Sequence, residues 1–176
     1  TFKDIHGCIE YDRWNPQEDT NCGGPEGAVP KDLGAVMGTS VNDLCNLVGG
    51  LSAGDTVQVK AIDGFYKEFP AEVFYDPSPA LGTGILCWYT KDCLESFQGT
   101  GYVPEYSSGM RLAFLADTST NPDGLHIFGI KDMVENLPSE IWHYYYGGTS
   151  NFYPACGGFQ VKWVSDIEIF SSESLP

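Results

Sequence analysis

The stretch "DTVQVKAIDGFYKEFP" (residues 55–70) constrains the fold most, because it combines strand-like alternation with a signal for chain reversal. Val57 and Val59 alternate with polar neighbours, as in a strand with one buried face. Asp63 and Gly64 then supply the two residues that a type I′ turn favours, and apolar positions continue beyond them. The segment therefore predicts an antiparallel β-hairpin.

A short helix is expected directly before this hairpin, in "TSVNDLCNLVGG" (residues 39–50). Its apolar residues fall at i, i+3, i+4 and i+7 and form one stripe: Val41, Leu44, Cys45 and Val48. Ser40 can cap the first turn, and the glycine pair Gly49–Gly50 can end the helix.

Most of the remaining chain reads as short strands, expected at residues 85–89, 110–116, 125–130 and 141–146. The closing stretch "FQVKWVSDIEIF" (residues 159–170) is expected to form one long strand with one buried face. Its odd-numbered positions are apolar: Phe159, Val161, Trp163, Ile167 and Ile169. The predicted fold class is α+β, mostly antiparallel β, with one or two short helices.

Length and composition predict a single domain over residues 1–176, with enough apolar content (42%) for a sizeable core. An acidic, turn-rich stretch at about residues 12–38 reads as an insertion. The chain has 24 Asp and Glu but only nine Lys and Arg, which gives a formal net charge of −15. Such a charge would repel nucleic acid and anionic lipid surfaces. No run approaches the ~20 apolar residues of a membrane span, so none is expected.

The even number of cysteines favours disulfides and an extracellular or cell-surface location. The six residues show no CxxC spacing: Cys8, Cys22, Cys45, Cys87, Cys93 and Cys156. Cys87 and Cys93 pair most easily, across a reversal at residues 90–92.

Cys8 is open to two interpretations. In "HGCIE" an extended backbone would place His6, Cys8 and Glu10 on one face, which could hold a metal ion. Cys8 could equally close a short disulfide loop with Cys22, which would leave Cys45 to pair with Cys156.

Four stretches, in this order, resemble the molybdopterin-binding oxidoreductase domain of the sulfite oxidase type. They are "VNDLCNLVGGLSAGDTVQVKAIDGFYKEFP", "GILCWYTKD", "GYVPEYSSGMRLAFLA" and "VKWVSDIEIF", and the resemblance covers about half of the chain. It implies a sulfite-oxidase-like scaffold. It also places Cys8, in "CIE", where the family has its molybdenum-binding cysteine, which implies a molybdopterin cofactor. The chain offers few donors for an anionic pterin, because its only arginines are Arg13 and Arg111.

A further candidate site is the stretch "DTSTNPDG" (residues 117–124). Oxygen-bearing side chains occupy every second position before a glycine: Asp117, Ser119, Asn121 and Asp123. This resembles part of a calcium loop, but no bidentate glutamate follows, and an ordinary turn explains the stretch equally well. His126 and His143 lie in strand-like apolar segments and are expected to be structural.

The aromatic stretch "IWHYYYG" (residues 141–147) carries no charged residue. Such a strand could form an interface at Tyr144, Tyr145 and Tyr146, or pack on its own core. We expect homo-oligomeric or polymeric association through β-strand contacts.

Two function classes follow from these observations. The preferred one is a non-catalytic extracellular or cell-surface protein, a coat-like subunit or binding module without a cofactor. The alternative is a molybdopterin-dependent oxidoreductase domain with Cys8 as the molybdenum ligand.

Overall fold

The structure is a computed structural model of the whole chain. It describes residues 2–3, 36–90, 101–103, 109–115, 135–142, 144–146, 152–154 and 156–172. At residues 2–3, 36, 90, 101, 144–146, 152–154 and 156–157 it describes the backbone alone.

The described elements are mainly strands. They are β1 (Phe2–Lys3), β2 (Val36–Ser40), β3 (Thr56–Ala61), β4 (Tyr66–Pro70), β5 (Thr83–Thr90), β6 (Gly101–Tyr102), β7 (Arg111–Leu115), β8 (Tyr144–Tyr146), β9 (Phe152–Pro154) and β10 (Val164–Phe170). The helical elements are α2 (Val41–Asn46), α3 (Glu72–Tyr75) and the 3₁₀ turns η2 (Ser139–Ile141) and η3 (Cys156–Phe159). All strand pairings are antiparallel, which confirms the predicted α+β class with antiparallel sheets.

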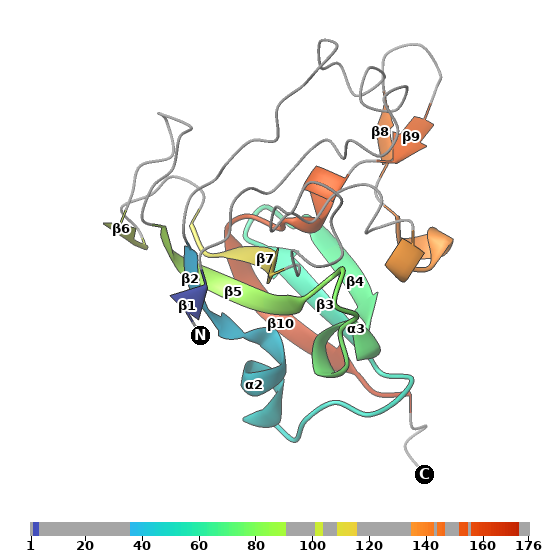
Figure 1. Cartoon of the computed structure of the whole chain (residues 1–176), viewed down its shortest axis with the longest axis horizontal. Helices are drawn as coiled ribbons and strands as arrows, with labels where there is room; N and C mark the ends of the chain where they lie inside the picture. The colour runs from blue at the N-terminus through green and yellow to red at the C-terminus, as the bar shows by residue number, and fades with distance from the viewer. Residues whose placement is uncertain are drawn as a thin grey trace.

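These strands form three sheets. The first has the order β1-β2-β5-β6, with β7 also paired to β5; the second is β10-β3-β4; and β8 pairs with β9 alone. In Figure 1 the first sheet crosses in front of the second, and α2 lies at the end of β2. No helix among the described residues is both long and apolar enough to cross a bilayer.

The predicted hairpin is confirmed as β3–β4. Its register pairs Val57 with Phe69, and exposure alternates along β3 as predicted. Asp63 accepts a hydrogen bond from the Phe65 backbone N–H at 2.9 Å, and Gly64 has a φ of 89°, so the reversal uses the residues that the sequence indicated. The expected type I′ geometry is wrong, because Asp63 lacks the positive φ that this turn requires at both central residues.

The predicted helix is confirmed as α2, although it is shorter than its apolar stripe. The Ser40 hydroxyl accepts a hydrogen bond from the Asp43 backbone N–H at 3.2 Å. Val41 and Cys45 are buried, but Val48 lies beyond the last helical residue and is 76% exposed. Val48 therefore does not extend the apolar stripe of the helix, because α2 ends before it.

The closing strand is shorter than the sequence predicted, since β10 begins only at Val164. Trp163 has a φ of 49° and is 49% exposed, and the register shifts between Val164 and Asp166. This bulge changes which face each residue occupies, so Val164 and Ile167 both point inward.

The other expected strands differ in outcome. Residues 85–89 lie in β5 and most of 110–116 forms β7, whereas 125–130 lies outside the described residues. The strand expected at 141–146 is wrong in its first part: Ile141 ends the turn η2, and only β8 is extended.

The core lies between the two larger sheets and centres on Phe69. Its ring centroid lies 5.4 Å from that of Phe74, 5.8 Å from that of Phe114 and 5.6 Å from that of Phe159. These rings come from β4, α3, β7 and η3, so one side chain links both sheets.

Candidate functional site

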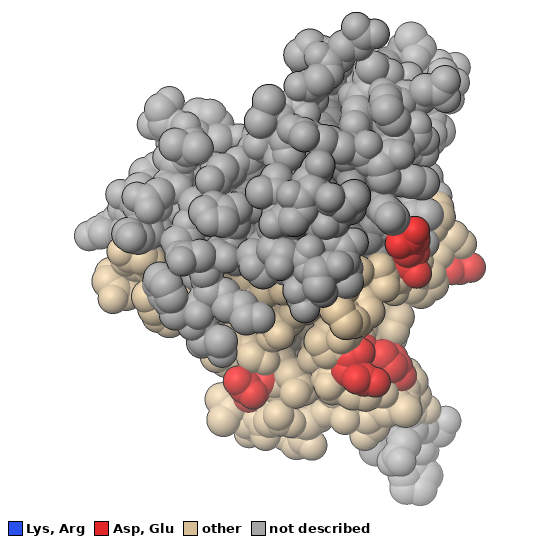
Figure 2. Space-filling view, in the orientation of Figure 1, with Lys and Arg blue, Asp and Glu red and all other residues tan. Residues whose placement is uncertain are grey.

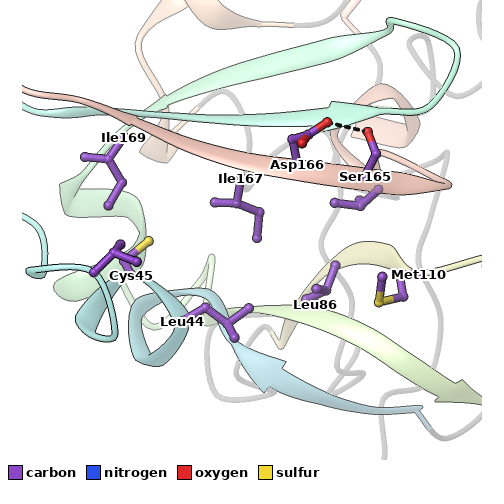
Figure 3. A pocket seen from close by; sticks show the side chains of 10 residues that line it. Leu44, Cys45, Leu86, Met110, Ser165, Asp166, Ile167 and Ile169 are labelled. Carbon is purple, nitrogen blue, oxygen red and sulfur yellow. Dashed lines mark hydrogen bonds between the residues drawn. The ribbon is translucent and has the colours of Figure 1, made fainter.

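A pocket of about 270 Å³ opens between strand β10 and helix α2. Figure 3 shows α2 and β5 on one side and β10 on the other. Its lining is mostly aliphatic: Leu44, Cys45, Val48, Leu86, Met110, Val164, Ser165, Asp166, Ile167 and Ile169. The volume falls just below the ~300–1,000 Å³ of small-molecule sites, so the pocket suits one or two apolar side chains.

Strand β10 is an edge strand of its sheet among the described residues. The hydrogen bond from the Ala61 N–H to the Phe65 carbonyl shows that odd-numbered residues of β3 bond to β4. Even-numbered residues of β3 therefore bond to β10, through Asp166 and Glu168. The backbone N–H and C=O groups of Ile167 and Ile169 then point away from β3, beside the pocket.

The edge of β10 next to this pocket is acidic. Asp166 and Glu168 are exposed on β10, and Asp43 is exposed on α2. Asp166 accepts a hydrogen bond from the Ser165 hydroxyl at 2.7 Å, and Lys60 lies opposite it on β3. On the face shown in Figure 2, the described surface displays Asp and Glu but no Lys or Arg.

Cys45 contributes the only sulfhydryl group of the pocket lining. It is buried, it is a free thiol, and burial raises its pKa. A thiol whose pKa is raised stays protonated at neutral pH, so Cys45 adds an apolar surface rather than a nucleophile.

A second notable feature is Arg111 on β7, which is only 2% exposed. Among the residues that the structure describes, its Nε and Nη1 atoms have no hydrogen-bond partner. Arg111 lies opposite Cys87 in the register of β5 and β7, on the sheet face that also carries buried Ile85 and Ala113. Two buried guanidinium nitrogens, which together carry three N–H groups, are suited to an anionic group.

Sequence reasoning missed both features. Arg111 lies in the strand expected at residues 110–116, and the one signal for its burial is a cation at the start of the apolar run "RLAFL". The pocket joins residues from four distant segments, so no local pattern indicates it.

Most residues that the sequence singled out as candidates lie outside the described part. These are Cys8, Cys22, Cys93, Asp117, Asn121 and Asp123, and only the backbone is described at Cys156 and at Tyr144, Tyr145 and Tyr146. The Cys87 sulfur donates a hydrogen bond to the Tyr89 carbonyl at 3.3 Å. Cys45 carries a free thiol in the structure and does not form the pairing with Cys156 that the sequence analysis considered. The pairings of the other cysteines and the calcium loop stay predictions.

Comparisons of the chain with family models, with curated proteins and with solved structures find no match.

Proposed function

We propose that this chain is a non-catalytic extracellular or cell-surface protein, a coat-like subunit or binding module, that associates with its own copies through strand edges. The scaffold is of the sulfite-oxidase-like type that the sequence resembles. The observation that carries the proposal is the small sheet formed by β8 and β9.

Strand β8 consists of Tyr144–Tyr146 and pairs only with β9 among the described strands. Figure 1 shows this pair apart from the two larger sheets. An edge strand offers unpaired backbone groups to another chain, and proteins usually protect such edges with Lys or Pro. β8 contains neither residue, so its sequence does not protect its outer edge against pairing.

The charge of the chain sets the conditions for this association. At −15 the copies repel one another, and dissolved salt screens that repulsion over ~10 Å at moderate ionic strength. Association should therefore strengthen as sodium chloride or calcium chloride is added.

Sedimentation velocity at rising protein and salt concentration tests the proposal. We expect oligomers that grow with salt, and we expect the Tyr145→Lys variant to weaken them by about tenfold, because lysine protects a strand edge. Tyr66→Lys on the edge strand β4 adds the same charge elsewhere and serves as the control. A wild-type monomer at high concentration, with and without calcium, would contradict a coat role.

Arg111 favours one alternative function. Its Nε and Nη1 atoms, which have no partner among the described residues, fit an anionic group such as the phosphate of a pterin, which the resemblance to molybdopterin oxidoreductases implies. The proposed molybdenum ligand, Cys8, lies outside the described residues. Elemental analysis distinguishes the two functions: we expect no stoichiometric molybdenum or tungsten, and about one metal atom per chain would establish the alternative.

A further inference from the structure

We propose that the groove between β10 and α2 binds an extended peptide in which basic and apolar residues alternate. The peptide would add as an additional antiparallel strand to the edge of β10 that follows Val164, whose own N–H bonds to the Met110 carbonyl at 2.8 Å. This site is separate from β8, and the proposal does not depend on self-association.

The backbone of β10 supplies the first part of the argument. The N–H and C=O groups of Ile167 and Ile169 point away from β3 and have no strand partner among the described residues. Strand addition to such an edge is a recurring mode of peptide recognition, in which backbone hydrogen bonds supply affinity and side-chain pockets supply specificity.

The pocket supplies the second part. A strand paired with β10 would place every second side chain on the same face as Ile167 and Ile169, which is the face that lines the pocket (Figure 3). Leu44 and Val48 of the α2 segment and Leu86 of β5 form the opposite wall. These positions of the peptide should therefore be apolar.

The charges on β10 supply the third part. Asp166 and Glu168 point to the opposite face from Ile167 and Ile169, so the intervening peptide residues would lie beside two carboxylates. Opposite charges across a strand pair are favourable, which selects lysine or arginine at those positions. The same carboxylates disfavour pairing of β10 with β10 of a second copy of this chain. In such a pair, Asp166 and Glu168 of one copy would lie close to the same two carboxylates of the other copy and repel them.

The exposed rim of the groove agrees with a protein partner. Val48 is 76% exposed and Met110 is 36% exposed, and both residues line the pocket. A peptide in the groove would remove this apolar surface from water.

Binding of two fluorescent heptapeptides tests the proposal by anisotropy: one alternates lysine and valine, and the other alternates glutamate and valine. We expect saturable binding of the lysine peptide alone. Methylating its backbone nitrogens that face β10 should weaken binding by about tenfold, because each methyl group removes one backbone hydrogen-bond donor.

Val48→Lys and Leu47→Lys form a matched pair of variants. They add the same charge at neighbouring exposed positions, but only Val48 lines the pocket. We expect Val48→Lys to weaken binding of the lysine peptide by about tenfold and Leu47→Lys to change it little. Asp166→Lys should shift the preference toward the glutamate peptide.

Three outcomes would overturn the proposal. The first is no saturable binding of the lysine peptide. The second is equal binding of the methylated peptide, or an equal loss in both lysine variants, which would indicate unspecific attraction to an acidic surface. The third is self-association of the wild type that Val48→Lys abolishes, which would assign the groove to a second copy of the chain.

Discussion

Asp55 is a buried carboxylate that connects three segments of the chain. Its Oδ2 accepts a hydrogen bond from the Ser52 N–H at 2.8 Å, its Oδ1 accepts one from the Ser172 N–H at 3.0 Å, and its carbonyl accepts one from the Ala71 N–H. The backbone hydrogen bonds from Ser172 and Ser52 lower the pKa of this carboxyl. Because its pKa is lower in the folded state than in the unfolded state, the ionised carboxylate stabilises the fold above the unfolded-state pKa. That contribution is lost as the pH falls through the folded-state pKa.

We therefore expect Asp55→Asn to lower the free energy of unfolding at neutral pH and to reduce its dependence on pH at the acid end. Urea unfolding at a series of pH values measures both effects. Asp76→Asn, at an exposed carboxylate, serves as the control and should stay close to the wild type. If Asp55→Asn lowers the free energy of unfolding by the same amount at acid and at neutral pH, the charge of Asp55 does not stabilise the fold.

At the scale of elements, helix α2 depends on its cap because it has only six residues. We expect Ser40→Ala to cost about 1 kcal/mol of unfolding free energy, because the Asp43 N–H loses its acceptor. Ser40→Asp should restore most of the loss. Urea unfolding measures the cost, and peptide anisotropy should show weaker binding, since α2 forms one wall of the groove.

The control for this change is Ser52→Ala, because Ser52 uses its backbone N–H, not its hydroxyl, to bond to Asp55. If Ser40→Ala and Ser52→Ala lower the free energy of unfolding equally, the hydrogen bond to the Ser40 hydroxyl does not stabilise α2.

At the scale of the whole molecule, Phe69 joins the two larger sheets through ring contacts with Phe74, Phe114 and Phe159. Phe69 is fully buried, so Phe69→Ala should cost about 3–5 kcal/mol. Both sheets should lose stability together, in one cooperative transition seen equally by far-UV circular dichroism and by tryptophan fluorescence.

Tyr66→Ala, in the same strand but half exposed, serves as the control and should cost far less. Two separate transitions in Phe69→Ala would mean that the sheets fold as independent units, which the shared aromatic core argues against.

Part of this fold follows from local sequence signals alone. Val57 and Val59 alternate with polar residues, and Asp63 with Gly64 indicates a chain reversal, so the β3–β4 hairpin follows from side-chain chemistry within a few residues. The turn type does not, because Asp63 lacks the positive φ of the type I′ turn that this pair favours. Ser40 likewise marks the start of α2, because a cap needs only a backbone N–H three residues ahead.

The tertiary structure decided the rest, because it depends on contacts between distant segments. The alternation at residues 159–169 predicts one continuous strand, but the left-handed conformation of Trp163 and the bulge after Val164 divide it. Alternation of apolar and polar residues indicates which face of a strand is apolar. It does not indicate which other strand pairs with it. For that reason the open edge of β10, the pocket that it forms with α2 and the burial of Arg111 emerged only when the sheets were assembled.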